Sequence, residues 1–122
     1  MALYDKVRFI VQTGAWAAGT AAVTFKEAIN ASGSSSSTLA FTTYYVVSGD
    51  TATKTTATSN TFNLATANRL YMVEFHANQL TPGKKFISIA IGNAGGADFY
   101  GVMAECYGAR YLQGASSPTS LT

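Results

Sequence analysis

The stretch 70-LYMVEFHA-77 decides the fold class, because large apolar side chains occupy every second position within it. A period of two is typical of a β-strand with one buried face, whereas an amphipathic helix repeats every three or four residues. The stretch therefore predicts a strand with one inward and one outward face, made of Tyr71, Val73 and Phe75, and of Met72, Glu74 and His76.

The same signature recurs on both sides of this stretch. Further strands are expected, in chain order, at residues 7–12, 22–28, 39–47, 61–64, 86–92 and 98–111. The Thr-rich residues 51–60 fit either an exposed edge strand or an extended loop, and only residues 66–70 and 77–80 could form a helical turn. The pattern predicts an all-β fold, a jelly-roll-like β-sandwich of about seven to eight antiparallel strands.

Length and composition indicate one domain. A chain of 122 residues can bury one self-sufficient core, and the composition shows neither an internal repeat nor a shift that marks a second domain. Residues 1–112 are expected to form the sandwich. Residues 113–122 are rich in Ser, Thr and Pro and are predicted to form an extended or flexible C-terminal tail.

Charge is scarce and scattered. Only 11% of the residues are charged, the net charge is +2, and Lys84-Lys85 is the only basic doublet. A nucleic-acid partner is therefore not expected, because such proteins gather basic side chains on one face. The sequence contains no apolar run long enough for a membrane span and no signal-peptide pattern, so no membrane partner is expected either.

Groups that could perform catalysis or bind metal are few. His76 and Cys106 are the only His and Cys side chains, too few for a structural zinc site. They could form a nucleophile and base pair, but we interpret them as a strand-surface imidazole and a small buried thiol. The glycine-rich residues 92–96 lack the Lys and Ser/Thr of a phosphate loop. We expect no catalytic residue, cofactor, metal or small-molecule ligand, and no enzyme.

Aromatic side chains are the best candidates for contact with other proteins, since such residues anchor interfaces. Trp16 lies in a small-residue loop between two glycines and is interpreted either as a plug over one end of the sandwich, which we prefer, or as an anchor against a neighbouring subunit. The candidate subunit or capsid contacts are Tyr4, Trp16, Tyr44, Tyr100, Tyr111 and Leu112.

Several segments together resemble a family of small virion structural proteins of tailed bacteriophages. The resemblance is carried by 11-VQTGAWAAGTAAVTFKEA-28, 39-LAFT-42, 58-TSNTF-62, 71-YMVEFHANQL-80 and 107-YGARY-111, which cover most of the chain. The chain departs from the family at His76, Asn78 and Gln79, where acidic residues are common in relatives. It also has a shorter segment ahead of the first strand.

The resemblance implies a capsid decoration, or cement, protein that binds the outer shell and stabilises it. The implied partners are the major capsid protein and further copies of this chain, with a trimer favoured. The implied location is the capsid exterior, after synthesis in the cytoplasm of the bacterial host. Two alternatives stay open: a structural protein of the tail, neck or fibre, and a glycan-binding jelly roll.

Overall fold

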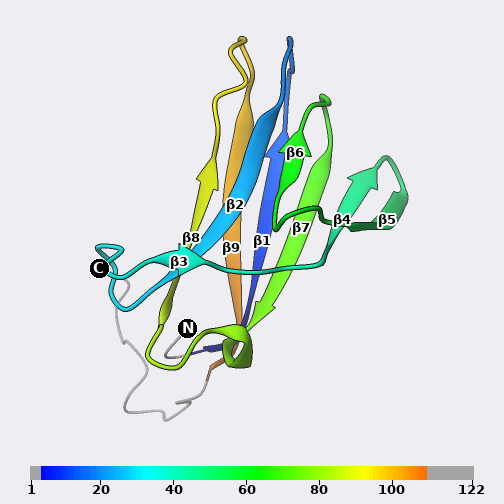
Figure 1. The fold of residues 1–122 in the computed structure, drawn as a ribbon. Helices are drawn as coiled ribbons and strands as arrows, with labels where there is room; N and C mark the ends of the chain where they lie inside the picture. The colour runs from blue at the N-terminus through cyan, green and yellow to red at the C-terminus, as the bar shows by residue number, and fades with distance from the viewer. Residues whose placement is uncertain (1–3, 110–122) are drawn as a thin grey trace, which may run out of the picture.

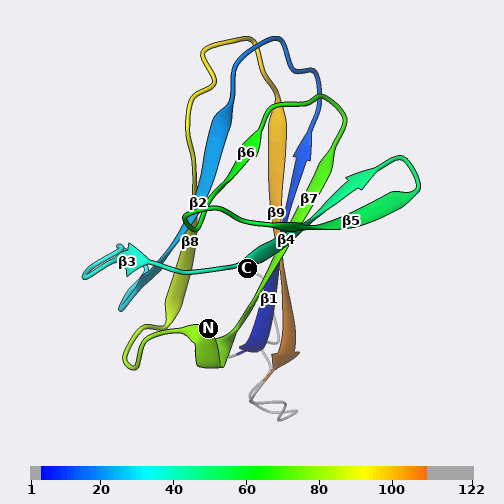
Figure 2. The ribbon, with the colours of Figure 1, turned by 45° about the vertical axis from the view of Figure 1, so that its right-hand side comes forward.

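The computed structural model describes residues 4–109 and contains two antiparallel sheets that face each other (Figures 1 and 2). The all-β sandwich is thus confirmed, with nine strands in place of the seven or eight expected. The only helical element in the described residues is one turn, η1 (Ala77–Gln79), within a segment expected to allow it.

Sheet A has five strands. Its order across the sheet is β5 (Thr51–Thr56), β4 (Thr43–Ser48), β7 (Leu70–His76), β1 (Tyr4–Thr13) and β9 (Tyr100–Ala109). The central strand β7 is the one whose alternation was clearest, and its Tyr71, Val73 and Phe75 are buried as predicted. The Thr-rich residues form the edge strand β5, which is exposed along almost its whole length.

Sheet B is built around β2 (Ala21–Ala28). One edge of β2 pairs with β8 (Phe86–Ile91), and the other pairs with β6 (Phe62–Leu64) near its start and with β3 (Ser37–Thr38) near its end. Sheet B is therefore narrower than sheet A. In the two views β8 lies on the same side of the sandwich as β9 (Figures 1 and 2).

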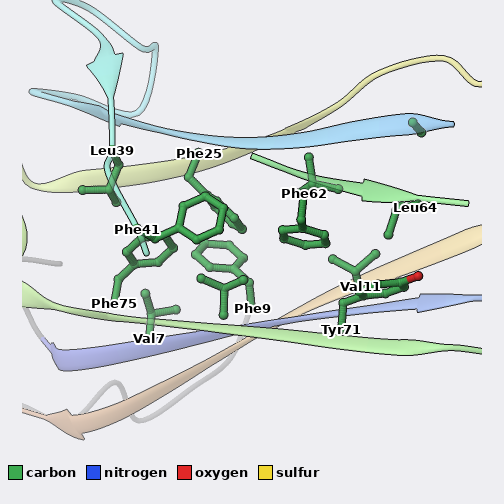
Figure 3. Close-up of a cluster of buried hydrophobic side chains, with 13 residues drawn as sticks. Val7, Phe9, Val11, Phe25, Leu39, Phe41, Phe62, Leu64, Tyr71 and Phe75 are labelled. Carbon is green, nitrogen blue, oxygen red and sulfur yellow. The ribbon is translucent and has the colours of Figure 1, made fainter. Parts of the chain in front are cut away.

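The core lies between the sheets and is dominated by aromatic rings (Figure 3). Phe25 of β2 lies at the centre, with ring centroids 4.8 Å from Phe75, 5.1 Å from Phe9 and 5.4 Å from Phe41. Tilted and edge-to-face pairs of this kind stabilise a core beyond the area they bury. The two sheets are thus packed most closely against each other where β2 lies over β1 and β7.

Residues 39–42 differ from the prediction. They were expected to begin a strand that continues to residue 47, yet the strand starts only at Thr43. Leu39 and Phe41 instead cross between the sheets and bury their side chains, while the Leu39 amide donates to the Phe25 carbonyl at 2.9 Å. The composition of the segment favoured a strand, but it could not show that the chain changes sheets there.

A buried carboxylate fixes one end of sheet B. Glu27 is only 3% exposed and accepts hydrogen bonds from the Thr81 amide at 2.9 Å, the Thr81 hydroxyl at 2.5 Å and the Ser37 hydroxyl at 3.1 Å. Burial acts to raise the pKa of Glu27, but these hydrogen bonds, with help from Lys84, bring it below its ordinary value. Glu27 therefore ties β3 and the turn after η1 to β2 as an ionised group.

Candidate binding surface

Strand β9 is the outermost strand of sheet A on the side of β8. It pairs with β1 in a regular antiparallel register that sets Val102 beside Val11, Ala104 beside Phe9 and Cys106 beside Val7. Side chains that are neighbours across a ladder lie on the same face. The inward face of β9 therefore continues the core face of β1, although sheet B does not cover it.

The uncovered strip forms an apolar groove between β8 and β9, which we call the side groove. It has a volume of about 230 Å³, and its lining residues are Tyr4, Val7, Phe9, Phe86, Ile87, Ala104 and Cys106. Within the described strands, β8 pairs with β2 and β9 with β1, and no pairing joins β8 to β9. The sandwich is consequently open along this side, and the buried core residues Val7 and Phe9 form part of the groove lining.

A second hollow lies where Gly101 leaves β9 without a side chain, and we call it the edge hollow. It has a volume of about 420 Å³ and is lined by Ile10, Gln12, Gly14, Phe99, Tyr100, Gly101, Val102 and Met103. A Cβ atom added at Gly101 would meet nothing within 4 Å. Packing therefore does not require glycine at this position, and the space beside it is free to receive a side chain from elsewhere.

Exposed apolar side chains gather on this side of the molecule. Nine large apolar side chains are exposed among the described residues, and seven of them lie on or beside β9: Tyr4, Phe86, Phe99, Tyr100, Val102, Met103 and Tyr107. Single exposed apolar residues are ordinary, but a contiguous group marks an interaction site. We call these seven residues, with the two hollows, the β9 surface.

A charged cluster borders the β9 surface on the outer face of sheet A. The Arg8 guanidinium donates to Glu74 Oε1 from Nε at 2.8 Å and from Nη2 at 2.5 Å, while Lys6 Nζ lies 3.6 Å from Glu74 Oε2. The hydrogen bond from Arg8 is the main reason that the pKa of Glu74 is lowered. Glu105 lies farther away, with its Oε2 3.9 Å from Arg8 Nη1.

Tyr107 joins this cluster to β9. Lys6 Nζ and Arg8 Cζ lie 5.1 Å and 5.5 Å from its ring centroid, within the range of cation–π attraction. Its hydroxyl donates to Glu105, and this bond is the main reason that the pKa of Tyr107 is raised. The tyrosine is 37% exposed, so part of its ring is open to solvent while the two cations lie over it.

The structure divides the predicted contact residues into three groups. Tyr4 and Tyr100 are exposed and belong to the β9 surface. Tyr44 is half-buried with its ring stacked on Phe62 at 4.5 Å, so it faces the core, while its neighbour Tyr45 faces outward and is exposed. Tyr111 and Leu112 lie outside the described residues.

Trp16 is half-buried and packs against the core cluster, and its Nε1 donates to the Gly19 carbonyl at 3.0 Å. This placement is that of a plug over the loop end of the sandwich, the interpretation preferred from the sequence. The loop is held to the one before β9, because the Gly14 amide donates to the Phe99 carbonyl at 2.8 Å and the Phe99 amide to the Ala15 carbonyl at 3.0 Å.

The prediction of a buried thiol at Cys106 is wrong. Cys106 is exposed in the side groove, because no strand of sheet B lies over β9. His76 is exposed at the end of β7, as predicted, and lies opposite Lys6 of β1. Strand β7 pairs with the edge of β1 that faces away from β9. The two side chains face opposite sides of sheet A, so the structure does not bring them together.

Within residues 4–109 no group of three or more His, Cys, Asp or Glu side chains is placed to hold a metal ion. Nor does that part of the chain contain a helix of the length and apolar character that crossing a membrane requires. No family model, curated protein sequence or solved structure matches this chain.

Proposed function

We propose that this chain is a structural protein of a bacteriophage virion that acts through binding and not through catalysis, and that it decorates the outside of the capsid. The observation that carries the proposal is the concentration of exposed apolar side chains on the β9 surface. A protein that works by adhesion needs such a surface, since burial of apolar area is the main driving force of association.

The rest of the molecule is consistent with this role. The sandwich has a tightly packed aromatic core over β1 and β7, which gives a rigid body that can present the apolar β9 surface to a partner. The resemblance of most of the chain to small virion proteins supplies the context, with the major capsid protein as partner and other copies of the chain as neighbours. The trimer implied by that resemblance stays a prediction.

Decoration stabilises a shell through many modest contacts. A subunit that binds where several capsid subunits meet is held by multivalent attachment, so weak contacts add up. Because the subunit binds the assembled shell in preference to dissociated capsid subunits, mass action shifts the equilibrium toward the intact particle.

The test is to purify particles of the phage that encodes the chain and to determine its position and copy number by cryo-electron microscopy and quantitative mass spectrometry. We expect hundreds of copies on the outer face of the capsid. A single ring of about a dozen copies would assign the chain to the neck or tail, since ring components follow cyclic symmetry. Its absence from particles would refute both assignments.

A further inference from the structure

We propose that two copies of this chain pair through β9, strand against antiparallel strand, in the register that places Ala104 of one copy opposite Ala104 of the other. Sheet A then continues across the contact as one sheet of ten strands. The pairing would not depend on a role in a virion, so it can be tested on the purified chain alone.

The first support is the chemistry of the edge itself. As the outermost strand, β9 presents a row of backbone N–H and C=O groups that no described strand pairs. Its ten residues carry one charge, Glu105, and Val102, Met103 and Tyr107 are exposed. Natural edge strands normally carry lysines, prolines or irregular backbone that block pairing. In β9 such an irregularity occurs at Gly108, whose φ is +64°, near the end of the strand and outside residues 101–107. The remaining apolar edge is a template for another strand.

The second support is that β9 is complementary to itself. Its sequence 101-GVMAECY-107 becomes, in the proposed register, a set of symmetric pairs about Ala104. Gly101 lies opposite Tyr107, Val102 opposite Cys106, and Met103 opposite Glu105. Each pair occurs twice, once on either side of the two-fold axis, so the contact is closed and isologous.

The third support is the edge hollow. It lies beside Gly101, which has nothing within 4 Å of the position of a Cβ atom. In the proposed register the Tyr107 ring of the second copy lies opposite Gly101 and can lean into this hollow. Covering a strand glycine with an aromatic side chain from the neighbouring strand is a known way to stabilise a sheet.

Neighbouring registers are less favourable. Residues opposite each other must lie on the same face, so the partner strand can shift only by two residues at a time. Each such shift moves the residue at the two-fold axis by one position, to Met103 or to Glu105. A centre at Met103 places Glu105 opposite Gly101 and its carboxylate in an apolar hollow. A centre at Glu105 places the two Glu105 carboxylates directly opposite each other, which is destabilising.

The first experiment measures oligomeric state and register together. Light scattering on the purified full chain should give twice the 12.8 kDa of one chain. Under mild oxidation, A104C in a C106S background should form a disulfide-linked dimer, since opposite residues have Cα atoms about 4.5–5.5 Å apart. Wild-type Cys106 should not cross-link within the pair, because Val102 lies opposite it, whereas V102C should cross-link to Cys106 of the other copy.

The matched control is V102C with C106S, which places a serine opposite the new cysteine and should lose the cross-link. A chain that is still monomeric at about 100 µM would overturn the proposal, because its dissociation constant would then exceed about 100 µM, a binding free energy weaker than about −5.5 kcal/mol. A trimer would overturn it in favour of the assembly implied by the resemblance. Efficient cross-linking of wild-type Cys106 would overturn the register.

Two substitutions of opposite charge at Met103 test the register without the use of cysteines. Met103 is 53% exposed, so neither M103E nor M103K should prevent folding, and the thermal midpoints of both monomers are expected to stay close to that of wild type. M103E places a second carboxylate opposite Glu105, whereas M103K places an ammonium there. We expect the dissociation constant of the pair to be about tenfold higher for M103E than for M103K. Equal constants for the two variants would contradict the proposed register.

Discussion

Strand β1 lies between two neighbours, β7 and β9, that share its inward face but end in opposite environments. Val7 is flanked by Phe75 of β7, which is fully buried, and by Cys106 of β9, which is exposed. The difference comes from the facing sheet, because Phe25 and Phe41 cover β7 while sheet B ends at β8. Alternation within a strand tells which side chains share a face, and only the width of the opposite sheet tells whether that face is buried.

The largest expected effect is at the covered strand. Phe75→Ala should reduce the free energy of unfolding by about 3–5 kcal/mol, because it removes a ring from a site packed on several sides. Cys106→Ala, on the other side of the same Val7, should change it by less than about 0.5 kcal/mol. Denaturant unfolding of both variants at low micromolar concentration measures the difference, and similar losses would show that β9 is covered after all.

A smaller effect is expected at Glu27, which holds β3 and the turn at Thr81 to β2 in the facing sheet B. Glu27→Gln should cost about 1–3 kcal/mol at pH 7, because the amide cannot accept all the hydrogen bonds that Thr81 and Ser37 donate to the carboxylate. Hydrogen exchange should rise in β3 and in the turn at Thr81, with little change in β9. Unchanged exchange at both segments would mean that Glu27 does not hold them.

The same variant gives a pH test. The pKa of Glu27 in the folded chain lies below its ordinary value of 4.5, so the carboxylate contributes its full stability above that pH. The contribution is lost as the pH falls through the lowered folded pKa. The gap in stability between wild type and Glu27→Gln should therefore be constant from about pH 6 to 8 and should shrink below about pH 4. A gap that persists at pH 2 would assign it to packing.

The smallest expected effect compares the two carboxylates beside Arg8. Glu74→Gln, on the β7 side, should cost about 0.5 kcal/mol at low salt, because it removes a paired charge that is about a third exposed. Glu105→Gln, on the β9 side, should cost less, since its carboxylate lies 3.9 Å from the guanidinium. Both losses should fall in 1 M salt, and a larger loss for Glu105 would reverse the assignment of the stronger partner.

The comparison also explains what the sequence could and could not predict. Strands with clear alternation were placed correctly, and so was the buried face of β7. The environment of Cys106 was predicted wrongly because it depends on how far a strand distant in sequence reaches. Adjacent Tyr44 and Tyr45 could not be told apart without the register that turns Tyr44 toward Phe62.

The candidate surface was only partly predictable for the same reason. Tyr4 and Tyr100 were predicted as candidate contacts because they are aromatic, and both are exposed, whereas the exposed Phe86, Phe99 and Met103 were not among the candidates. Phe86 and Met103 lie in strands where an apolar residue is ordinarily a core residue. A signal was present in the chain, since Gly101 and Tyr107 are placed symmetrically about Ala104, but it has meaning only once β9 is known to be an edge.

The opposite edge of sheet A decides how far assembly can proceed. Strand β5 is short, exposed, built mostly of threonine and has Lys54 at its centre, features that resist the addition of another strand. In the proposed pair joined through β9, the two outer edges of the ten-stranded sheet are therefore both β5, which does not accept a further strand. Association stops at the pair, whereas a chain with a pairing-competent strand at both edges would polymerise into fibrils.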